Sequence, residues 1–331
     1  MNDHSSLHDI DDLKTFTADD MKRVNRVIEE HLRSEVVLIN QLSAHIIHSG
    51  GKRLRPMLVM LAARACGYDD PAGHDALMAA TVEFIHTATL LHDDVVDESE
   101  MRRGQETASS IWGNEAAVLV GDYLYSRAFQ MMVQAQSLPI MNLLADTTNT
   151  IAQGEVMQLL NINDPDTSEE RYHQVIYSKT ACLFQAAARI GAIISDADPA
   201  IADALGEYGK QLGIAFQLVD DALDYEADSA ELGKNVGDDL AEGKPTLPLI
   251  HALEKGNPQQ QALIREAIEN GGLEHIDAIT AAIRDTGALA YTHRQAIEHA
   301  NRAKSALDAL PPSPARDALA FIADFAVQRS Y

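Results

Sequence analysis

Residues His86 to Gly104 read HTATLLHDDVVDESEMRRG, and this stretch indicates both the fold class and the chemistry. Its first half is an apolar run of the kind that forms a buried helix. The run leads into three carboxylates, Asp93, Asp94 and Asp97. Asp93 and Asp97 are four residues apart, so on a helix they lie on one face, close enough to share a divalent cation. Two arginines, Arg102 and Arg103, follow on the next bend.

A second acidic cluster lies far downstream, in FQLVDDALDYEAD, and repeats the spacing of the first. Its carboxylates are Asp220, Asp221 and Asp224. Both clusters follow apolar sequence and lie near the end of a predicted helix, where the helix dipole favours cations. One such cluster alone would most often be a solvated helix face, but two alike clusters indicate cation binding. Oxygen ligands favour Mg²⁺ or Mn²⁺, and Mg²⁺ takes further ligands from water and substrate phosphate, so we expect a diphosphate there.

Basic residues are few, because the chain of 331 residues has a formal net charge of -24. This balance argues against nucleic-acid binding, which depends on basic faces. The basic motifs comprise Lys52, Arg53 and Arg55 after a glycine pair, Arg102 and Arg103, Lys179 beside Thr180, Lys234 and Lys244. Lys and Arg side chains in bends near glycine can converge on diphosphate oxygens.

The chain as a whole predicts helices. Hydrophobic residues make up 46% of it and aromatic residues only 5%, and no strand-like alternation persists. Helices are expected over about 18–47, 70–97, 114–136, 139–161, 168–194 and from 199 through the second acidic cluster, with a loop over 233–248. We therefore predict an all-α fold, a large helical bundle around a central cavity in one domain over 1–331, with a flexible polar N-terminus over 1–17.

The sequence also indicates a cytoplasmic protein. Cys66 and Cys182 stand apart in apolar surroundings without metal-ligand spacing, so both are expected to be core thiols in a reducing compartment. The acidic N-terminal segment lacks the features of a signal peptide. No apolar run reaches about 18 residues, so no membrane-spanning helix is predicted.

Taken together, the motifs resemble those of the trans-polyprenyl diphosphate synthases. The resemblance covers about residue 29 to the C-terminus and rests on GGKRLRP, EFIHTATLLHDDVVDESEMRRG, GDYLYSRAFQMM, YSKTACLF, FQLVDDALDY and GKNVGDDLAEGKPTLP. It implies the isoprenoid synthase fold, a homodimer, and a reaction that requires Mg²⁺ or Mn²⁺. An allylic diphosphate, expected to be farnesyl diphosphate, loses its diphosphate, and the double bond of isopentenyl diphosphate attacks the carbocation. Repetition gives a long all-trans chain, expected to be octaprenyl diphosphate for quinone side chains, whose release implies transient membrane contact.

The resemblance also implies roles for single residues. Direct metal ligands would be Asp93, Asp97 and Asp220, with Asp94, Asp221, Asp224 and Asp238 completing or orienting the set. The allylic diphosphate would be held by Arg102, Lys179, Thr180, Gln217, Lys234 and Lys244. Isopentenyl diphosphate would be held by Lys52, Arg55, His86 and Arg103. The catalytic set would be Asp93, Asp94, Asp97, Arg102, Lys179, Asp220, Asp221 and Lys234, with the departing diphosphate as the proton acceptor.

A growing isoprenoid needs an apolar tunnel, which we expect to run back between the two aspartate helices. Ala88 and Thr89 lie one turn below the first cluster and would let the chain pass, while Phe129 and Met132 would form the floor. Replacing either floor residue with alanine is expected to lengthen the product, and Ala88→Tyr to shorten it. Gly206, Gly209 and Gly213 share one face of the second helix, which indicates either a passing chain or tight helix packing.

Other functions remain open at this point. The chain could make a shorter or longer product, act as a terpene cyclase, or serve as a non-catalytic subunit of such an enzyme. A di-iron carboxylate protein is suggested by the spacing Glu83-x-x-His86 and Glu170-x-x-His173. Such a site would leave the paired aspartate clusters and the basic motifs without a purpose.

Overall fold

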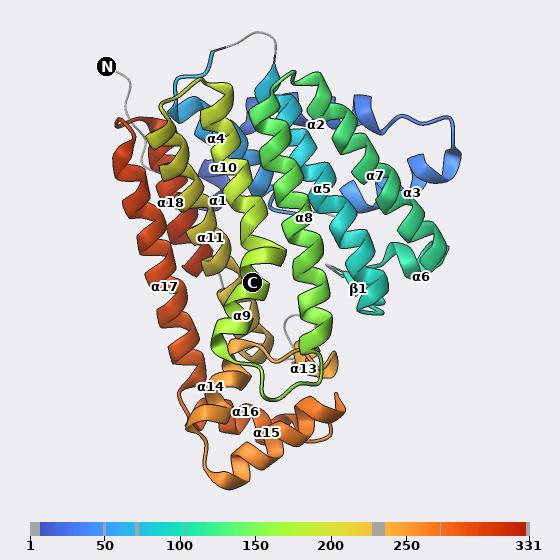
Figure 1. Cartoon of the computed structure of the whole chain (residues 1–331), viewed down its shortest axis with the longest axis vertical. Coiled ribbons are helices and arrows are strands. Elements are labelled where there is room, and N and C mark those ends of the chain that lie inside the picture. Colours follow the sequence, from blue (N-terminus) through green and yellow to red (C-terminus); the bar gives the residue numbers. More distant parts are fainter. Residues whose placement is uncertain are drawn as a thin grey trace. The chain divides into compact units, whose positions relative to one another are not determined.

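The computed structural model describes residues 7–48, 51–69, 73–102, 104–226, 236–271 and 273–328. Over these residues the chain is almost entirely helical, which confirms the predicted all-α class (Figure 1). The strands found there are β1 (Met101–Arg102) and β2 (Gln105–Glu106), which form one antiparallel pair. A strand of two residues is too short to show alternation, so this hairpin could not be predicted from the sequence. In the described part of the chain, no helix is long and apolar enough to cross a membrane.

The chain groups into two compact units. Unit 1 comprises Met1–Thr148, Ala186–Gly206 and Ala309–Leu319, and unit 2 comprises Asn149–Gln185, Glu207–Asp308 and Ala320–Tyr331. Several helices contribute residues to both units: α8 (Leu138–Asn161), α10 (Cys182–Ile194), α11 (Pro199–Glu226), η2 (Leu307–Ala309) and α18 (Pro314–Gln328). That the chain is a single domain stays a prediction.

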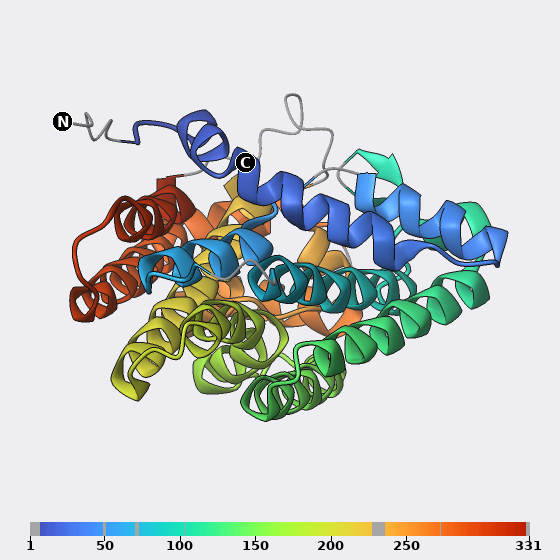
Figure 2. The same ribbon diagram turned by 90° about the horizontal axis from the view of Figure 1, so that it is seen from above.

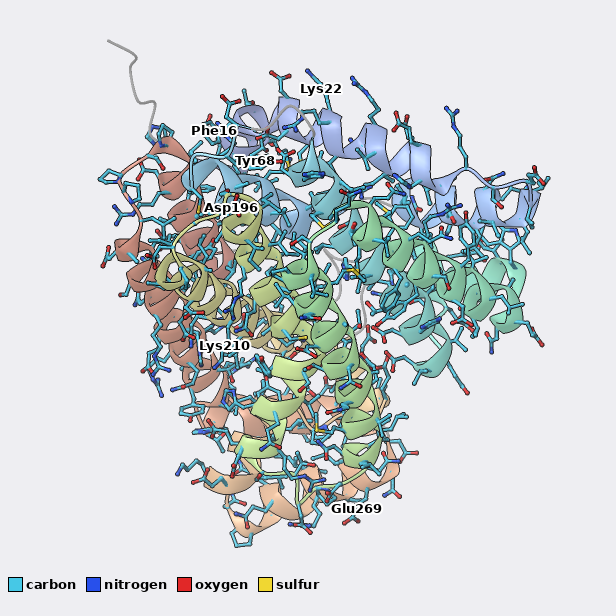
Figure 3. The ribbon with its side chains drawn as sticks, turned by 45° about the horizontal axis from the view of Figure 1, so that its top comes forward. Phe16, Lys22, Tyr68, Asp196, Lys210 and Glu269 are labelled. Carbon is cyan, nitrogen blue, oxygen red and sulfur yellow. The ribbon has the colours of Figure 1, made fainter. Side chains whose placement is uncertain are left out.

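The remaining helices of unit 1 are α1 (Ile10–Phe16), α2 (Ala18–Leu32), α3 (Val37–His48), α4 (Leu54–Ala65), α5 (His74–Val96), α6 (Ala108–Trp112) and α7 (Asn114–Gln134). Helix α5 is the centre of this unit, because α2, α4 and α7 all pack against it (Figure 2). Its core side chains include Phe84 and Leu91, each of which contributes about 1.5–3 kcal/mol through burial. At the surface, Lys22 projects outward from α2 and forms an exposed ion pair with Asp19 (Figure 3).

Unit 2 contains α9 (Glu169–Ile176), η1 (Tyr177–Ala181), α13 (Asp238–Ala241), α14 (Leu247–Lys255), α15 (Pro258–Asn270), α16 (Ile276–Asp285) and α17 (Ala288–Ala306). Helices α14, α15 and α16 pack on one another around a cluster that includes Leu249, Ile264 and Ile279. The segment η1 is a turn of π-helix between α9 and α10. Such π-helical turns are rare and often mark functional sites.

Two glycines of α11 allow close packing rather than the passage of a chain. A Cβ on Gly213 would lie 2.6 Å from the Cα of Ala181 in η1, and one on Gly209 would collide with the carbonyl of Phe184. Tight packing was one of the two alternatives that the sequence left open. The glycines therefore bring α11 against η1 and the start of α10.

The N-terminal part differs from the sequence prediction in two places. Ile10–Phe16, expected to be flexible, form α1, with Asp9 as the N-cap and Leu13 buried. The helix expected over 18–47 is broken, because α2 ends at Leu32 and α3 begins at Val37. In the break, the Asn40 side chain accepts from the Ser34 N–H (3.0 Å) and donates to the Ser34 carbonyl (2.8 Å), which competes with helical hydrogen bonding.

The other expected helices agree with the structure to within a few residues. Helix α5 starts at His74, and residues 70–72, where the expected helix begins, lie outside the described residues. Of the loop predicted over 233–248, residues 233–235 also lie outside the described residues. In the rest of it the prediction is partly wrong, because Asp238–Ala241 form the short helix α13 and α14 begins at Leu247.

Candidate active site

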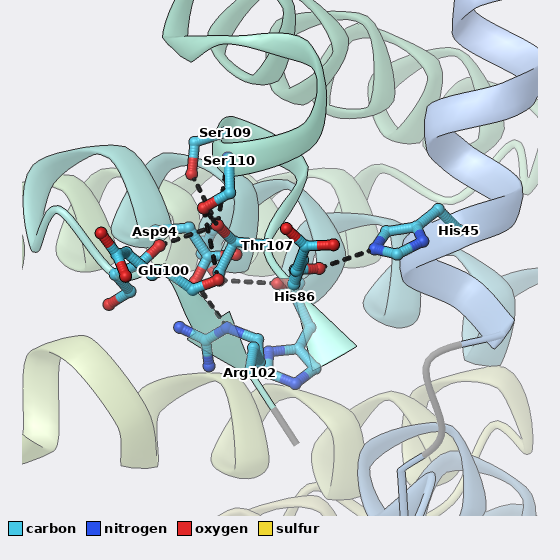
Figure 4. Close-up of polar contacts among 11 residues, drawn as sticks. His45, His86, Asp94, Glu100, Arg102, Thr107, Ser109 and Ser110 are labelled. Atoms are coloured by element: carbon cyan, nitrogen blue, oxygen red, sulfur yellow. Dashed lines mark hydrogen bonds and ion pairs between the residues drawn. The ribbon is translucent and has the colours of Figure 1, made fainter. Parts of the chain in front are cut away.

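The first acidic cluster (Asp93, Asp94 and Asp97), called the first aspartate motif from here on, lies in the last turn of α5 and at its C-cap. Asp97 caps the helix, donating its N–H to the Asp93 carbonyl (2.8 Å), and both side chains are partly exposed. Asp94 is different, since only 1% of it is exposed and it accepts a 2.6 Å hydrogen bond from Arg102 Nε (Figure 4). Burial raises the pKa of Asp94, and the charge of Arg102 opposes that rise. Asp94 is therefore turned into the protein while its two neighbours lie nearer to solvent.

Arg102 lies on β1, in a hairpin that is fastened at several points. The Thr107 hydroxyl donates to the Ser99 carbonyl (2.7 Å), and its N–H donates to the Glu100 carbonyl (2.9 Å). His45 of α3 donates from Nε2 to the Glu106 carbonyl (2.9 Å; Figure 4). These contacts hold the bend that carries Arg102. Arg103 lies outside the described residues.

Two of the residues predicted to hold isopentenyl diphosphate lie together. Arg55 Nη1 donates to His86 Nε2 at 3.1 Å, from α4 to α5. Lys52 is exposed just before α4. Arg53 instead binds the Glu83 carboxylate at 2.8 Å, so Glu83 is the core polar partner of an arginine.

These contacts argue against the di-iron alternative. Glu83 and His86 each pair with an arginine of α4 or its N-cap. In unit 2, Glu170 is exposed and His173 faces Glu169 (3.5 Å). His92, to which the sequence assigned no role, lies against Gly121 and 3.3 Å from Asp122 of α7.

The second aspartate motif (Asp220, Asp221 and Asp224) lies near the end of α11. Like the first motif, it has one buried carboxylate that is held by hydrogen-bond donors of the chain. Asp221 is 3% exposed, and its two oxygens accept from different donors: the Tyr172 hydroxyl (2.5 Å) and Gln217 Nε2 (2.8 Å). Thr180 in turn donates its hydroxyl to Gln217 Oε1 (3.0 Å). Burial raises the pKa of Asp221 well above its ordinary value, and both hydrogen bonds oppose that rise. Asp220 is partly exposed.

Asp224, the third carboxylate of this motif, caps the short helix α13. It accepts from the backbone N–H groups of Asp238 (3.1 Å) and Asp239 (3.2 Å). Burial, with the negative charge of Asp239, raises the pKa of Asp224 to about 8. Burial also raises the pKa of Asp239 to about 6, against the attraction of Lys244. Lys244 is buried and pairs with Glu242 (2.5 Å).

The π-helical turn η1 carries Lys179 and Thr180. Lys179 Nζ lies 2.9 Å from the Glu155 carboxylate and 2.7 Å from Gln158 Oε1, both on α8. The structure thus places Lys179, Thr180 and Gln217 in unit 2 near the second motif or on the turn beside it. Lys234 lies outside the described residues.

Both motifs have the donor chemistry of a hard cation site. Each has one buried carboxylate held by donors of the chain and at least one partly exposed carboxylate beside it. Within the described residues, no three His, Cys, Asp or Glu side chains are already grouped to hold a metal. Carboxylate ligands that need phosphate oxygens to complete the shell are typical of Mg²⁺ sites, so the residues fit such an ion.

The proposed tunnel residues differ in how far they are exposed to solvent. Ala88 and Met132 are buried, whereas Phe129 is 40% exposed and contacts Tyr125 on the surface of α7. The Thr89 hydroxyl donates to the His86 carbonyl of its own helix. Phe129 therefore lies at the surface rather than inside unit 1, and the roles of Ala88, Thr89 and Met132 stay predictions.

Sequence reasoning missed three contributors to the site. Asp239 had a visible signal, because it adjoins Asp238 in a glycine-rich acidic segment. Tyr172 and Thr107 had none, since each acts through a contact that only the folded chain creates.

The fold and the paired aspartate motifs define a class of protein, and comparison with known proteins agrees. The chain belongs to the polyprenyl synthetase family, whose family model matches residues 36–286. Members are metal-dependent prenyltransferases that extend a prenyl diphosphate, and this chain is accordingly a trans-prenyltransferase.

Within this family, the chain is similar to proteins that make long prenyl diphosphates. The chain is 53% identical to octaprenyl diphosphate synthase of Escherichia coli K12 over 321 residues, which cover 97% of this chain and 99% of the relative. Its structure is similar to that of a polyprenyl synthase from Caulobacter crescentus complexed with calcium and isoprenyl diphosphate (TM-score 0.93, 45% identity, 98% of each chain). It is also similar to a decaprenyl diphosphate synthase from Rhodobacter capsulatus (TM-score 0.92, 45% identity, covering 98% of this chain and 100% of that one).

Proposed function

We propose that this enzyme adds isopentenyl diphosphate repeatedly to farnesyl diphosphate, with Mg²⁺, and releases all-trans octaprenyl diphosphate for quinone side chains. The observation that carries the proposal is the 53% identity, over nearly the whole chain, to an octaprenyl diphosphate synthase. A longer product is the second candidate, because a decaprenyl diphosphate synthase is 45% identical.

Asp93, Asp97 and Asp220 would be the metal ligands, and the metal, when bound, would supply a Lewis acid for the departing diphosphate. Asp94 and Asp221 orient these ligands, since each is buried and fixed by donors of the chain.

The basic residues act on the two diphosphates. Arg102, Lys179 and Lys244, with Lys234, stabilise the charge that develops on the leaving group. Thr180 and Gln217 hold the allylic substrate; the Thr180 hydroxyl donates to Gln217, and Gln217 in turn donates to Asp221. Lys52, Arg55, His86 and Arg103 bind isopentenyl diphosphate, and the paired Arg55 and His86 support a common target.

The deciding experiment is incubation with farnesyl diphosphate, isopentenyl diphosphate and Mg²⁺, followed by chromatographic sizing of the dephosphorylated product. An octaprenyl product is expected, and a decaprenyl product would transfer support to the second candidate. Ala88→Tyr should shorten the product if the chain passes this position, and circular dichroism would confirm that the variant is folded.

The same enzyme is proposed to be a cytoplasmic homodimer of single-domain subunits that contacts membranes transiently for product release. Helix α7 supports the dimer, because Leu119 and Val133, 67% and 57% exposed, lie on one face together with Phe129. Exposed apolar stripes of this kind favour a protein partner. Light scattering should give a dimer for the wild type and a monomer for Leu119→Asp; a monomeric wild type would contradict the proposal. Two free cysteines fit a reducing compartment.

A further inference from the structure

Tyr172 is a buried side chain on α9 to which the proposed chemistry gives no role. Only 4% of it is exposed, and its ring packs in a core cluster with Ile176, Leu218 and Leu247. A phenol hydroxyl has an ordinary pKa of about 10, so at neutral pH it is protonated and can donate a hydrogen bond.

The acceptor of that hydrogen bond is the Asp221 carboxylate. The Tyr172 hydroxyl lies 2.5 Å from Asp221 Oδ2, while Gln217 Nε2 lies 2.8 Å from Oδ1. Both oxygens are therefore occupied by donors from the chain, and two fixed donors leave the carboxylate one orientation. Hydrogen bonds to a charged group are stronger than those between neutral groups, and a buried charge that loses one is destabilised.

Anchoring Asp221 also restrains the turn of α11 that carries Asp220. Adjacent residues of a helix share one rigid backbone turn and are separated by about 100° around its axis, so holding Asp221 limits rotation of that turn and movement of Asp220 with it. Asp220 is the partly exposed carboxylate of the pair. Close packing of α11 on η1 at Gly213 also limits movement of the helix.

We infer that Tyr172 is a positioning residue of the second aspartate motif: its hydroxyl fixes Asp221 and thereby sets the direction in which Asp220 meets the metal–diphosphate complex. The inference rests on the proposed metal role of Asp220. It assigns a donor from outside the aspartate motifs to the same task that Arg102 performs for Asp94. Partners that orient metal ligands in this way typically change metal affinity or activity by about 10–100-fold when removed.

The test compares Tyr172→Phe, which keeps the ring and removes the hydroxyl, with Tyr208→Phe. Tyr208 is fully buried on α11, so the control removes a hydroxyl from the core at a distance from the aspartates. Binding of Mn²⁺ in the presence of inorganic diphosphate is measured by electron paramagnetic resonance. Tyr172→Phe should weaken Mn²⁺ binding about 10-fold or more. It should raise the Mg²⁺ concentration that gives half-maximal activity by the same factor, while KM for isopentenyl diphosphate stays unchanged. Wild-type Mn²⁺ affinity in Tyr172→Phe, or an equal loss in Tyr208→Phe, would overturn the inference.

A double-substitution cycle keeps the question answerable if Tyr172→Phe is less stable. Because Tyr172 acts through Asp221, the double variant Tyr172→Phe/Asp221→Asn should bind Mn²⁺ with the same affinity as Asp221→Asn alone. If the losses of the two single variants add up in the double variant, the inference is refuted. Asp220→Asn separates the two proposals. If Asp220→Asn keeps wild-type Mn²⁺ binding, the metal role of Asp220 is wrong; if it loses binding and Tyr172→Phe does not, only the role of Tyr172 is wrong.

Discussion

Replacing Gly154 with alanine tests whether the π-helical turn must keep its place for catalysis. Gly154 is buried in α8, and a Cβ there would lie 2.8 Å from the backbone N of Lys179, 2.8 Å from Ser178 Cβ and 2.9 Å from Ser178 C. Backbone atoms cannot rotate away as the end of a flexible side chain can. The added methyl group therefore has to displace η1, which carries Lys179 and Thr180.

Two opposing effects set the expected stability of Gly154→Ala. In a helix interior alanine is favoured over glycine by about 0.5–1 kcal/mol. Overpacking a well-packed interior costs about 1–3 kcal/mol. The steric cost is the larger, so we expect a net loss of up to about 2 kcal/mol. With an unfolding entropy of about 2.1 cal/mol/K per residue, this would lower the melting temperature of a chain of 331 residues by up to roughly 3 °C.

The effect on catalysis should exceed the effect on stability. A shift of about 1 Å in a group that positions substrate can cost about 100-fold in rate, so kcat is expected to fall at least 10-fold. Steady-state condensation of isopentenyl diphosphate and thermal unfolding give the two measurements. Gln153→Ala is the matched control, because Gln153 is the exposed neighbour on the same helix and the change adds no atom near η1. A higher melting temperature with wild-type kcat for Gly154→Ala would refute the reasoning.

Three further predictions concern buried charges. Arg102→Ala removes the donor to buried Asp94 and should lower the free energy of unfolding by about 2–3 kcal/mol in urea titration, besides reducing kcat; wild-type stability would contradict the role of the contact. Arg23→Ala breaks a two-bond contact (2.6 and 2.8 Å) with buried Asp75, and because Arg23 is partly exposed we expect a loss of only about 1–2 kcal/mol with kcat unchanged, so a large loss of activity would count against a purely structural role. Burial, with nearby positive charge, lowers the pKa of His299 to about 4. As the pH falls below about 6.5, this histidine therefore binds a proton in the unfolded chain before it does so in the folded protein. The free energy of unfolding should accordingly drop by up to about 3 kcal/mol by pH 4. Urea titrations across this range should show a smaller slope for His299→Gln, and an identical slope would exclude His299 as the cause.

The helices could be predicted because their signals are local. Helix α7 begins at Asn114, directly after Gly113, and α11 begins at Pro199, directly after Asp198. A preceding glycine, and a capping aspartate followed by proline, are both local signals that predict a helix start. The break after Leu32 was missed because it depends on the Asn40 side chain, which competes with the helix from several residues away.

The candidate site divides in the same way. The carboxylates and most of the basic residues were found from spacing and family resemblance, because their chemical types are visible in the chain. Which aspartate of each motif is turned inward was not visible, since that depends on burial and on the donors that reach it.

The sequence by itself determined the helical class, the two acidic motifs and the family, because periodicity, spacing and residue type are properties of neighbouring residues. The tertiary structure alone decided that Asp221 is held by Tyr172, 49 residues away in the chain, and that Gly213 brings α11 against the π-helical turn. It also placed Phe129, expected in a tunnel floor, at the surface of α7. Hydrogen bonds and close packing act between groups that meet only after folding, so no local pattern records which groups will meet.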